Sequence, residues 1–90
     1  MLKSQQRNIF EKDVKRAQKR GLNLEKLKEV MRLLVEEQPL SIKHRDHSLV
    51  GNYAGHRECH IQPDWLLVYK KEIDTIIFER TGTHADLFRM

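Results

Sequence analysis

Residues 56–80, HRECHIQPDWLLVYKKEIDTIIFER, decide the fold because they hold three short apolar runs separated by turns. Valine, isoleucine, leucine, phenylalanine and tyrosine dominate the second and third runs, so we expect strands at 56–61, 65–70 and 75–80. The connections between them are too short for a crossover, which predicts an antiparallel meander. One face of this sheet must then be covered to bury its apolar side chains.

Two amphipathic helices precede these strands and can supply that cover. The first, expected at 6–20, carries apolar residues at i, i+4 and i+7 and ends at Gly21. The second starts after Asn23, a good N-cap, and ends by Gln38 because Pro39 follows. So short a link predicts an antiparallel helical hairpin. The exposed basic residues of the hairpin are Lys12, Lys15, Arg16, Lys19 and Arg20. They form either a solvated face or a surface that contacts RNA or a partner.

Together these elements predict an α+β fold, one domain over residues 1–90 in which an N-terminal helical hairpin packs on a twisted, mainly antiparallel sheet. Residues 2–4 could add a strand, and residues 40–55 lack periodicity and should form a loop. The chain is 39% hydrophobic, has no apolar run long enough to span a membrane and lacks the apolar core of a signal peptide. Its single cysteine, Cys59, cannot form an internal disulfide and is interpreted as a semi-buried strand residue, which is compatible with the cytoplasm.

The net charge of +4 and the pI near 9.4 favour anionic partners. Nucleic acid fits this expectation and so does an acidic protein, because a basic surface raises encounter rates with either. A charge of this size on 90 residues is also ordinary for solubility. The net charge therefore predicts a negatively charged partner, but it does not distinguish nucleic acid from an acidic protein.

Four candidate acid–base groups lie at the edges of the expected strands and loop, and they are His47, His60, Asp64 and His84. RNA can be cleaved without a metal or cofactor if one group takes the ribose 2′-OH proton, another protonates the departing 5′ oxygen and a cation stabilises the phosphorane. Histidine suits both transfers because its unperturbed pKa of about 6.5 lies near working pH. Further candidates for binding RNA, by phosphate contact or by stacking on bases, are Arg57, Arg80, Trp65 and Phe88.

Strand alternation gives one test of this arrangement. His56, Glu58 and His60 should share one face of an extended strand, with Ile61 on the other. Because Ile61 looks core-directed, His60 should lie on the open face, near the turn that carries Asp64. A β-bulge in this strand would reverse that expectation.

Metal binding is the rival chemistry. His44 and His47 are three residues apart and His56 and His60 four apart, spacings that recur in zinc sites. A spacing of four brings two ligands together on a helix, but on a strand it separates them by roughly 13 Å. The expected secondary structure therefore favours proton transfer over metal binding.

The strings DHSLVGNYAGHRECHIQPDWLLVYK (46–70) and ERTGTHADLF (79–88) resemble the YafQ-type mRNA interferases of the RelE/ParE toxin superfamily, and the similarity extends to KDVKRAQKR in the first helix. The resemblance implies a RelE-like fold and a toxin of a type II toxin–antitoxin system that cleaves translated mRNA on the ribosome. Matched by motif, the active-site residues of the family fall on His47, His60, Asp64 and His84, and Trp65 and Phe88 support the site or the RNA. Ser48 stands where a relative has proline, which would loosen the loop that aims His47.

The implied reaction is a transesterification that leaves a 2′,3′-cyclic phosphate and a 5′-OH without metal or cofactor. His84 is expected to transfer one proton and His60 or His47 the other, with Asp64 orienting an imidazole or acting as base. The resemblance also implies a cognate antitoxin, the ribosome and mRNA as partners, a cytoplasmic location, and contact with promoter DNA only through the antitoxin complex. The alternatives are a ParE-like inhibitor of DNA gyrase or a non-catalytic module that binds antitoxin or nucleic acid, and the set of acid–base groups favours the nuclease.

Overall fold

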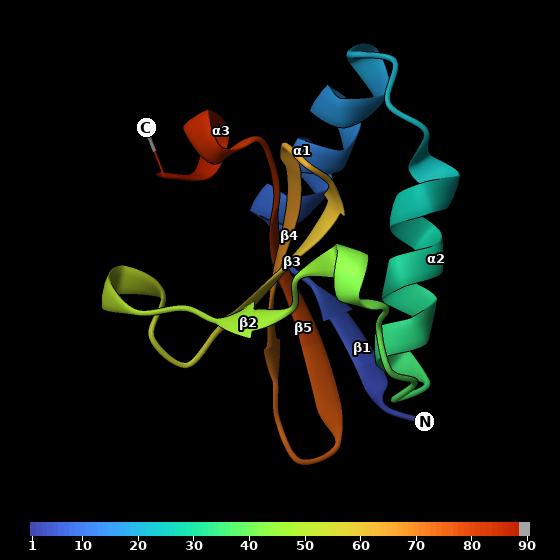
Figure 1. Ribbon diagram of the computed structural model, residues 1–90, viewed down its shortest axis with the longest axis vertical. Coiled ribbons are helices and arrows are strands. Elements are labelled where there is room, and N and C mark those ends of the chain that lie inside the picture. Colours follow the sequence, from blue (N-terminus) through green and yellow to red (C-terminus); the bar gives the residue numbers. More distant parts are fainter. Residues whose placement is uncertain (89–90) are drawn as a thin grey trace.

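The computed structural model describes residues 1–88, which form a mixed five-stranded sheet with helices on both faces (Figure 1). The last two residues of the predicted 1–90 domain lie outside this range. In chain order the elements are β1 (Lys3–Gln6), α1 (Asn8–Lys19), α2 (Leu24–Val35), the 3-10 turn η1 (Ile42–His44), β2 (His47–Ser48), the 3-10 turn η2 (Gly51–Tyr53), β3 (Arg57–Gln62), β4 (Trp65–Lys71), β5 (Thr75–Gly82) and α3 (His84–Phe88).

The strand order is β1-β5-β4-β3-β2. The predicted antiparallel meander is confirmed as β3, β4 and β5, with β5 continuing to Gly82. The N-terminal strand is confirmed too, and it pairs in parallel with β5 at the edge of the sheet. A two-residue strand inside the predicted loop, β2, pairs antiparallel with β3 and forms the opposite edge of the sheet. This small addition fixes the loop on the sheet.

Helices α1 and α2 cover one face of the sheet and form the main core with it. Phe10 of α1 packs on Phe78 of β5 with ring centroids 5.8 Å apart, and Val30 of α2 is 2% exposed. Burying side chains of this size contributes about 1.5–3 kcal/mol each. Cys59 lies in the same core with no exposed surface, so it is a strand residue as predicted but fully buried, not semi-buried, and burial raises the pKa of its thiol.

The helix ends follow local signals in most places. Gly21 adopts a φ of 81° and ends α1, and the Asn23 side chain accepts the backbone N–H of Glu25 to cap α2. α2 ends at Val35, three residues earlier than Pro39 predicts, because Glu37 adopts a left-handed φ of 57° and turns the chain. Within residues 1–88 no helix is long and apolar enough to cross a membrane.

The second face of the sheet, predicted to be open, is partly covered. α3 and the loop before β3 lie on this side, across the sheet from α2 (Figure 1). Leu66 and Val68 of β4 are fully buried against Leu87 of α3, while Leu67 and Tyr69 point into the main core. β4 is thus buried on both faces, which is why its sequence is a continuous apolar run and not an alternating one.

A network of arginines and carboxylates fastens α1 and α3 to β5. Asp86 of α3 accepts hydrogen bonds from Arg20 at 2.6 Å and 3.2 Å and lies 3.7 Å from Arg16. Its side chain also accepts the backbone N–H of Thr83, whose hydroxyl oxygen accepts the N–H of Asp86, a reciprocal cap. A Cβ on Gly82 would lie 2.9 Å from Asp86 Oδ2, so the close approach needs glycine there.

The Asp86→Asn substitution is expected to lower the free energy of unfolding by about 2 kcal/mol at pH 7, the scale for a hydrogen bond to a charged group. The hydrogen bond from Arg20, helped by those from Thr83, holds the pKa of Asp86 well below its usual range. A depressed folded-state pKa stabilises the protein above the unfolded-state value of about 3.9, and this stabilisation is lost as the pH falls below that value. Urea unfolding at pH 7 and pH 3 should therefore show a difference from wild type that shrinks in acid. The exposed Glu25→Gln is the control, and an equal difference at both pH values would contradict the ion pair.

Candidate active site

His47 reaches the second face of the sheet because β2 pairs with β3. His47 lies opposite Glu58 in the register and Ser48 opposite Arg57. Alternation along the strand therefore points His47 and Glu58 to the second face, while Ser48 and Arg57 point to the face of the main core. Two residues of strand are enough to aim one side chain out of the loop.

Glu58 lies between two imidazoles and is the central carboxylate of the site. Its Oε2 is 3.2 Å from Nε2 of His47 and 3.6 Å from Nε2 of His60, and the residue is only 5% exposed. The other ring nitrogen, Nδ1, faces a backbone carbonyl in each case, that of Arg45 at 2.7 Å and that of Pro63 at 3.3 Å. Each of these imidazoles therefore has an acceptor beside both nitrogens.

Sequence reasoning did not select Glu58 as a site residue. The signal was present in the alternation that put Glu58 on the same face as His60. A lone glutamate in a strand is ordinarily solvent-facing, and only the pairing of β2 brings a second histidine to it. His60 itself lies on the second face as expected and is 8% exposed. The register between β3 and β4 shifts at a bulge between His60 and Gln62. This bulge comes after His60, so it does not change the face on which His60 lies.

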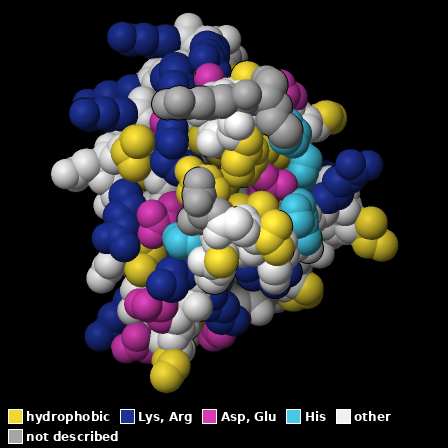
Figure 2. Space-filling model, turned by 90° about the vertical axis from the view of Figure 1, so that its left-hand side faces the viewer, with side chains coloured by type: hydrophobic (Ala, Val, Ile, Leu, Met, Phe, Trp, Pro, Cys, Tyr) yellow, Lys and Arg dark blue, Asp and Glu magenta, His cyan; other side chains and the backbone are white. Residues whose placement is uncertain are grey.

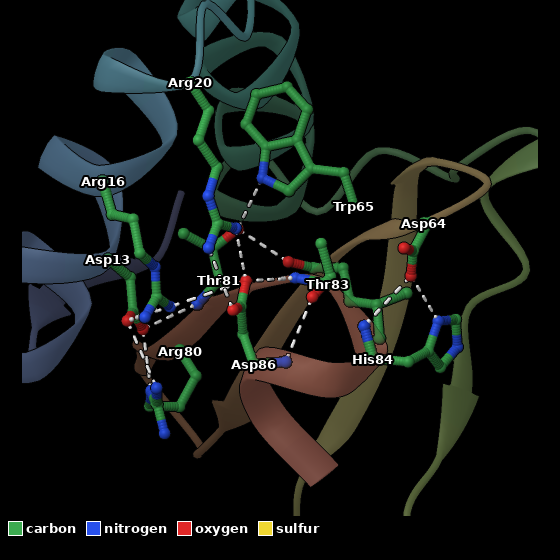
Figure 3. A network of polar contacts seen from close by, with 11 residues as sticks. Asp13, Arg16, Arg20, Asp64, Trp65, Arg80, Thr81, Thr83, His84 and Asp86 are labelled. Carbon is green, nitrogen blue, oxygen red and sulfur yellow. Dashed lines mark hydrogen bonds and ion pairs between the residues drawn. The ribbon is translucent and has the colours of Figure 1, made fainter. Parts of the chain in front are cut away.

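His84 and Asp64 form a hydrogen-bonded pair at the end of the sheet. Asp64 Oδ1 accepts the backbone N–H of His84 at 3.0 Å and lies 2.8 Å from its Nδ1 (Figure 3). These hydrogen bonds, the backbone one first, lower the pKa of Asp64, so it is a carboxylate at neutral pH. An ionised carboxylate only accepts, so Nδ1 carries the proton and Nε2 is left as the second nitrogen of His84.

The structure brings the predicted acid–base groups together. The ring centroids of His47 and His60 are 6.5 Å apart, and those of His60 and His84 5.7 Å apart. Phe88 continues the row, 6.4 Å from the ring of His84. Figure 2 shows histidine side chains gathered around acidic ones on this face, with lysine and arginine side chains toward its margins. We call His47, Glu58, His60, Asp64 and His84 the histidine cluster.

Arg80 is held by a buried carboxylate. Its Nε and Nη2 donate to Asp13 of α1 at 2.7 Å and 3.2 Å (Figure 3), and this contact raises the pKa of the guanidinium. Arg80 lies opposite Val68 in the register, and Val68 packs in the core of the second face, where the histidine cluster lies. The hydrogen bonds to Asp13 use the edge of the guanidinium that carries Nε and Nη2. Nη1, which has two N–H groups, lies on the other edge.

Two predicted RNA contacts do not fit the structure. Trp65 is 1% exposed, and its indole N–H donates to the Thr81 hydroxyl at 2.9 Å (Figure 3), so its ring is closed to bases and the stacking prediction is wrong. Arg57 lies on the opposite face of β3 from His60, where it donates to Asp46 and Ser48. Its predicted contact with the phosphate therefore lacks support. Both residues remain candidates for supporting the site, since Asp46 and Ser48 flank His47.

The histidine pairs with zinc-like spacing do not converge as pairs. Nδ1 of His44 contacts the backbone carbonyl of His60 at 2.7 Å, and His56 lies with Nε2 3.5 Å from Glu79. No group of three or more histidine, cysteine, aspartate or glutamate side chains among residues 1–88 is arranged to hold a metal ion. Of the two groupings that do form, the one at Asp64 is hydrogen-bonded, and the one around Glu58 consists of contacts between the carboxylate and two imidazoles at 3.2 Å and 3.6 Å.

Comparison with known proteins gives a consistent match over nearly the whole chain. The family model for the bacterial toxin of type II toxin–antitoxin systems, YafQ, matches residues 2–89. The mRNA interferase toxin YafQ of Escherichia coli K12 is 49% identical over 80 residues, covering 88% of this chain and 87% of the relative. The crystal structure of YafQ from E. coli BL21(DE3) superposes with a TM-score of 0.93 at 43% identity, covering 98% of this chain and 99% of that one. The crystal structure of the E. coli DinJ-YafQ complex superposes with a TM-score of 0.92 at 44% identity, again covering 98% of this chain and 99% of that one.

Proposed function

The chain belongs to the YafQ family of bacterial toxins of type II toxin–antitoxin systems, and on that premise we propose that it is an mRNA interferase, an endoribonuclease that cleaves mRNA during translation. The observation that carries this proposal is the histidine cluster, in which three imidazoles and two carboxylates from β2, β3, the turn before β4 and α3 share one surface. The 49% identical relative is an mRNA interferase by name, which supports the same activity.

The proposed reaction is a metal-independent transesterification. A base takes the proton of the ribose 2′-OH, the 2′ oxygen bonds to the adjacent phosphorus, and the bond from phosphorus to the 5′ oxygen breaks. An acid delivers a proton to that 5′ oxygen, so the products are a 2′,3′-cyclic phosphate and a 5′-OH. The charge that develops on the phosphoryl oxygens needs a cation, and Arg80, oriented by Asp13, is our candidate.

The hydrogen bonds favour different roles for the imidazoles. Asp64 keeps the proton of His84 on Nδ1, so a neutral His84 has its lone pair on Nε2 and can act as the base. His60 and His47 have acceptors beside both nitrogens, and only the doubly protonated form donates to both. We therefore assign the acid to His60, the nearer of the two to His84, with His47 and Glu58 supporting it.

The proposal extends to the partners of the family. Since the relative in the DinJ-YafQ complex is bound to DinJ, we propose a cognate antitoxin for this chain. An acidic segment of it would complement the net charge of +4. Dependence on the ribosome is proposed because the site is an open surface, and the ribosome would hold the mRNA across it. Translating ribosomes also place the proposed activity in the cytoplasm.

Primer extension on an mRNA incubated with the purified protein tests the proposal. Cuts within codons only when translating ribosomes are present are the expected result. Cuts without ribosomes would overturn ribosome dependence and leave the nuclease. No cuts in either sample would overturn the nuclease, and a DNA supercoiling assay with gyrase would then be the next measurement.

Replacing Glu58 by glutamine is expected to lower the cleavage rate at least about tenfold, because a neutral amide lacks the negative charge that the carboxylate places beside two imidazoles. Single-turnover cleavage rates, with thermal unfolding of the same variant measured beside them, check this effect. The control is Glu79→Gln, which removes a carboxylate contacted by Arg7 and His56. A lower rate accompanied by an equally large loss of thermal stability would reduce Glu58 to a structural role.

A further inference from the structure

A cleft on the α2 side of the sheet, reached from the histidine cluster around β3 at His60, has no part in the chemistry described above. It has a volume of about 720 Å³, within the roughly 300–1,000 Å³ range of small-molecule sites, and lies between α2, η1 and the turn from β3 to β4. His60 lines both the cleft and the cluster, and Pro63 of the lining precedes Asp64 in the chain. In Figure 1 the turn η1, which follows α2, comes back beside that helix.

The walls of the cleft combine apolar surface with unpaired cations. Val30 and Ile61 line it from the core side and Pro63 from the turn. Lys26, Lys43 and Arg45 line it as well, and none of the three forms an ion pair within residues 1–88. The two acidic residues of the lining differ in this respect, because Glu25 pairs with Lys28 and Glu29 with Arg32 along α2. The uncompensated charge of the cleft is therefore positive.

The cleft is coupled to the cluster through the backbone of the loop. The contact of His44 Nδ1 with the His60 carbonyl, at 2.7 Å, fixes η1 against β3. Arg45 has a left-handed φ of 46°, and its carbonyl oxygen contacts Nδ1 of His47. A non-glycine residue in this conformation is strained and is typical of functional sites. A ligand that contacts Lys43 or Arg45 therefore touches the segment that aims His47.

We propose that this cleft binds the nucleotide next to the cleaved bond, and that Gln62 contributes to the preference for its base. This inference rests on the proposed nuclease function. An RNA strand that passes from the cluster around β3 at His60, the residue that the two sites share, would place a neighbouring nucleotide in the cleft. The base packs on the apolar wall and the phosphate contacts the lining cations Lys26, Lys43 and Arg45. The amide of Gln62 makes no hydrogen bond within the described residues and offers both donors and an acceptor to a base edge.

Removing the cations tests the phosphate contact. The double variant Lys26→Ala/Lys43→Ala is expected to raise the KM for translated mRNA at least about fivefold with little change in kcat, because it weakens binding and leaves the cluster intact. Lys3→Ala/Lys71→Ala is the matched control, since it removes the same charge from exposed residues that neither line the cleft nor pair with a residue of its lining. Equal KM values for the two double variants would overturn the proposal.

Gln62→Ala tests the base contact, because a residue that reads a base changes which sites are cut and not only how fast. The distribution of cuts along an mRNA, mapped by primer extension, is expected to broaden at one position next to the cleaved bond. An unchanged distribution would remove Gln62 from the proposal. Loss of binding in the lysine variant with an unchanged distribution here would mean that the cations bind ribosomal RNA instead.

A binding measurement separates failure of the cleft from failure of the nuclease. A 2′-O-methyl RNA tetranucleotide cannot be cleaved, because the attacking hydroxyl is blocked. Titrated into the ¹⁵N-labelled wild type, it should shift the backbone amide signals of Lys26, Lys43 and Gln62 as well as those of the cluster. If the protein cleaves mRNA but only amide signals of the histidine cluster shift, the proposed nucleotide site in the cleft is wrong and the proposed nuclease activity stands. Shifts in the cleft without cleavage in any sample would keep a nucleotide site and overturn the enzyme.

Discussion

Replacing His84 by alanine is expected to slow mRNA cleavage by about 10²- to 10⁴-fold, the usual loss on removing a general acid or base. The imidazole is the group that the structure orients most directly, because Asp64 binds both its Nδ1 and its backbone N–H. Alanine keeps the backbone hydrogen bond, so α3 should remain in place. The side chain of His84 is 37% exposed, and its removal leaves no buried cavity.

Single-turnover cleavage of an mRNA on programmed ribosomes, at saturating protein, measures this effect on the chemical step alone. Thermal unfolding should show a change of no more than a few degrees. His56→Ala is the matched control, because it removes an imidazole that contacts Glu79 outside the histidine cluster. A rate for His84→Ala within threefold of wild type would remove this residue from the proton transfers.

Replacing Asp13 by alanine is expected to lower the free energy of unfolding by about 3–5 kcal/mol, the scale for removing one partner of a buried ion pair. Asp13 is 4% exposed and accepts four hydrogen bonds, two from Arg80, one from Arg16 and one from the backbone N–H of Thr81. Its loss would leave the half-buried guanidinium of Arg80 without its partner. The total free energy of unfolding of a small domain is about 5–15 kcal/mol, so this single change removes a large share of the stability.

Urea unfolding of the purified variant, followed by circular dichroism, measures the loss. Glu11→Ala is the control on the same helix, because Glu11 is exposed and its side chain has no hydrogen bond or ion pair within residues 1–88. A difference below about 1 kcal/mol between wild type and Asp13→Ala would mean that solvent replaces the carboxylate. The cleavage rate should fall as well, since Asp13 orients the arginine proposed to meet the phosphate.

Much of the fold could be predicted from local patterns. The three strands of the meander and both long helices were readable because their apolar periodicity, Gly21 and Asn23 act over a few residues. β2 and α3 were not, since two residues of strand and five of helix carry no periodicity. Their existence depends on partners distant in sequence, Glu58 for His47 and Asp64 for His84. The early end of α2 depends on the backbone of Glu37, which an ordinary glutamate does not signal.

The residues of the candidate site also divide into those that could be predicted from the sequence and those that depend on partners distant in sequence. His47, His60, Asp64 and His84 were candidates from their positions at the edges of the expected strands and loop, and the family resemblance matched the same four. Alternation also predicted the face on which His60 lies. The role of Glu58 did not follow, because it depends on the register between β2 and β3. Burial of Trp65 and the direction of Arg57 were missed for a related reason. A tryptophan at a turn and an arginine in a strand can face either way until the packing of the whole sheet is known.

The parallel pairing of β1 with β5 has a consequence for the order in which the protein can fold as it is synthesised. The contacts that hold the N-terminal segment join Arg7 to Glu79, 72 residues apart, and Asp13 to Arg80, 67 apart. Until β5 has left the ribosomal tunnel, β1 has no strand beside it, and of its two arginine partners Asp13 has only Arg16. Contacts of such long range form late and slowly. A nascent chain that stops at Lys71 should therefore stay protease-sensitive throughout, and toxicity should begin only once β5 has closed the sheet.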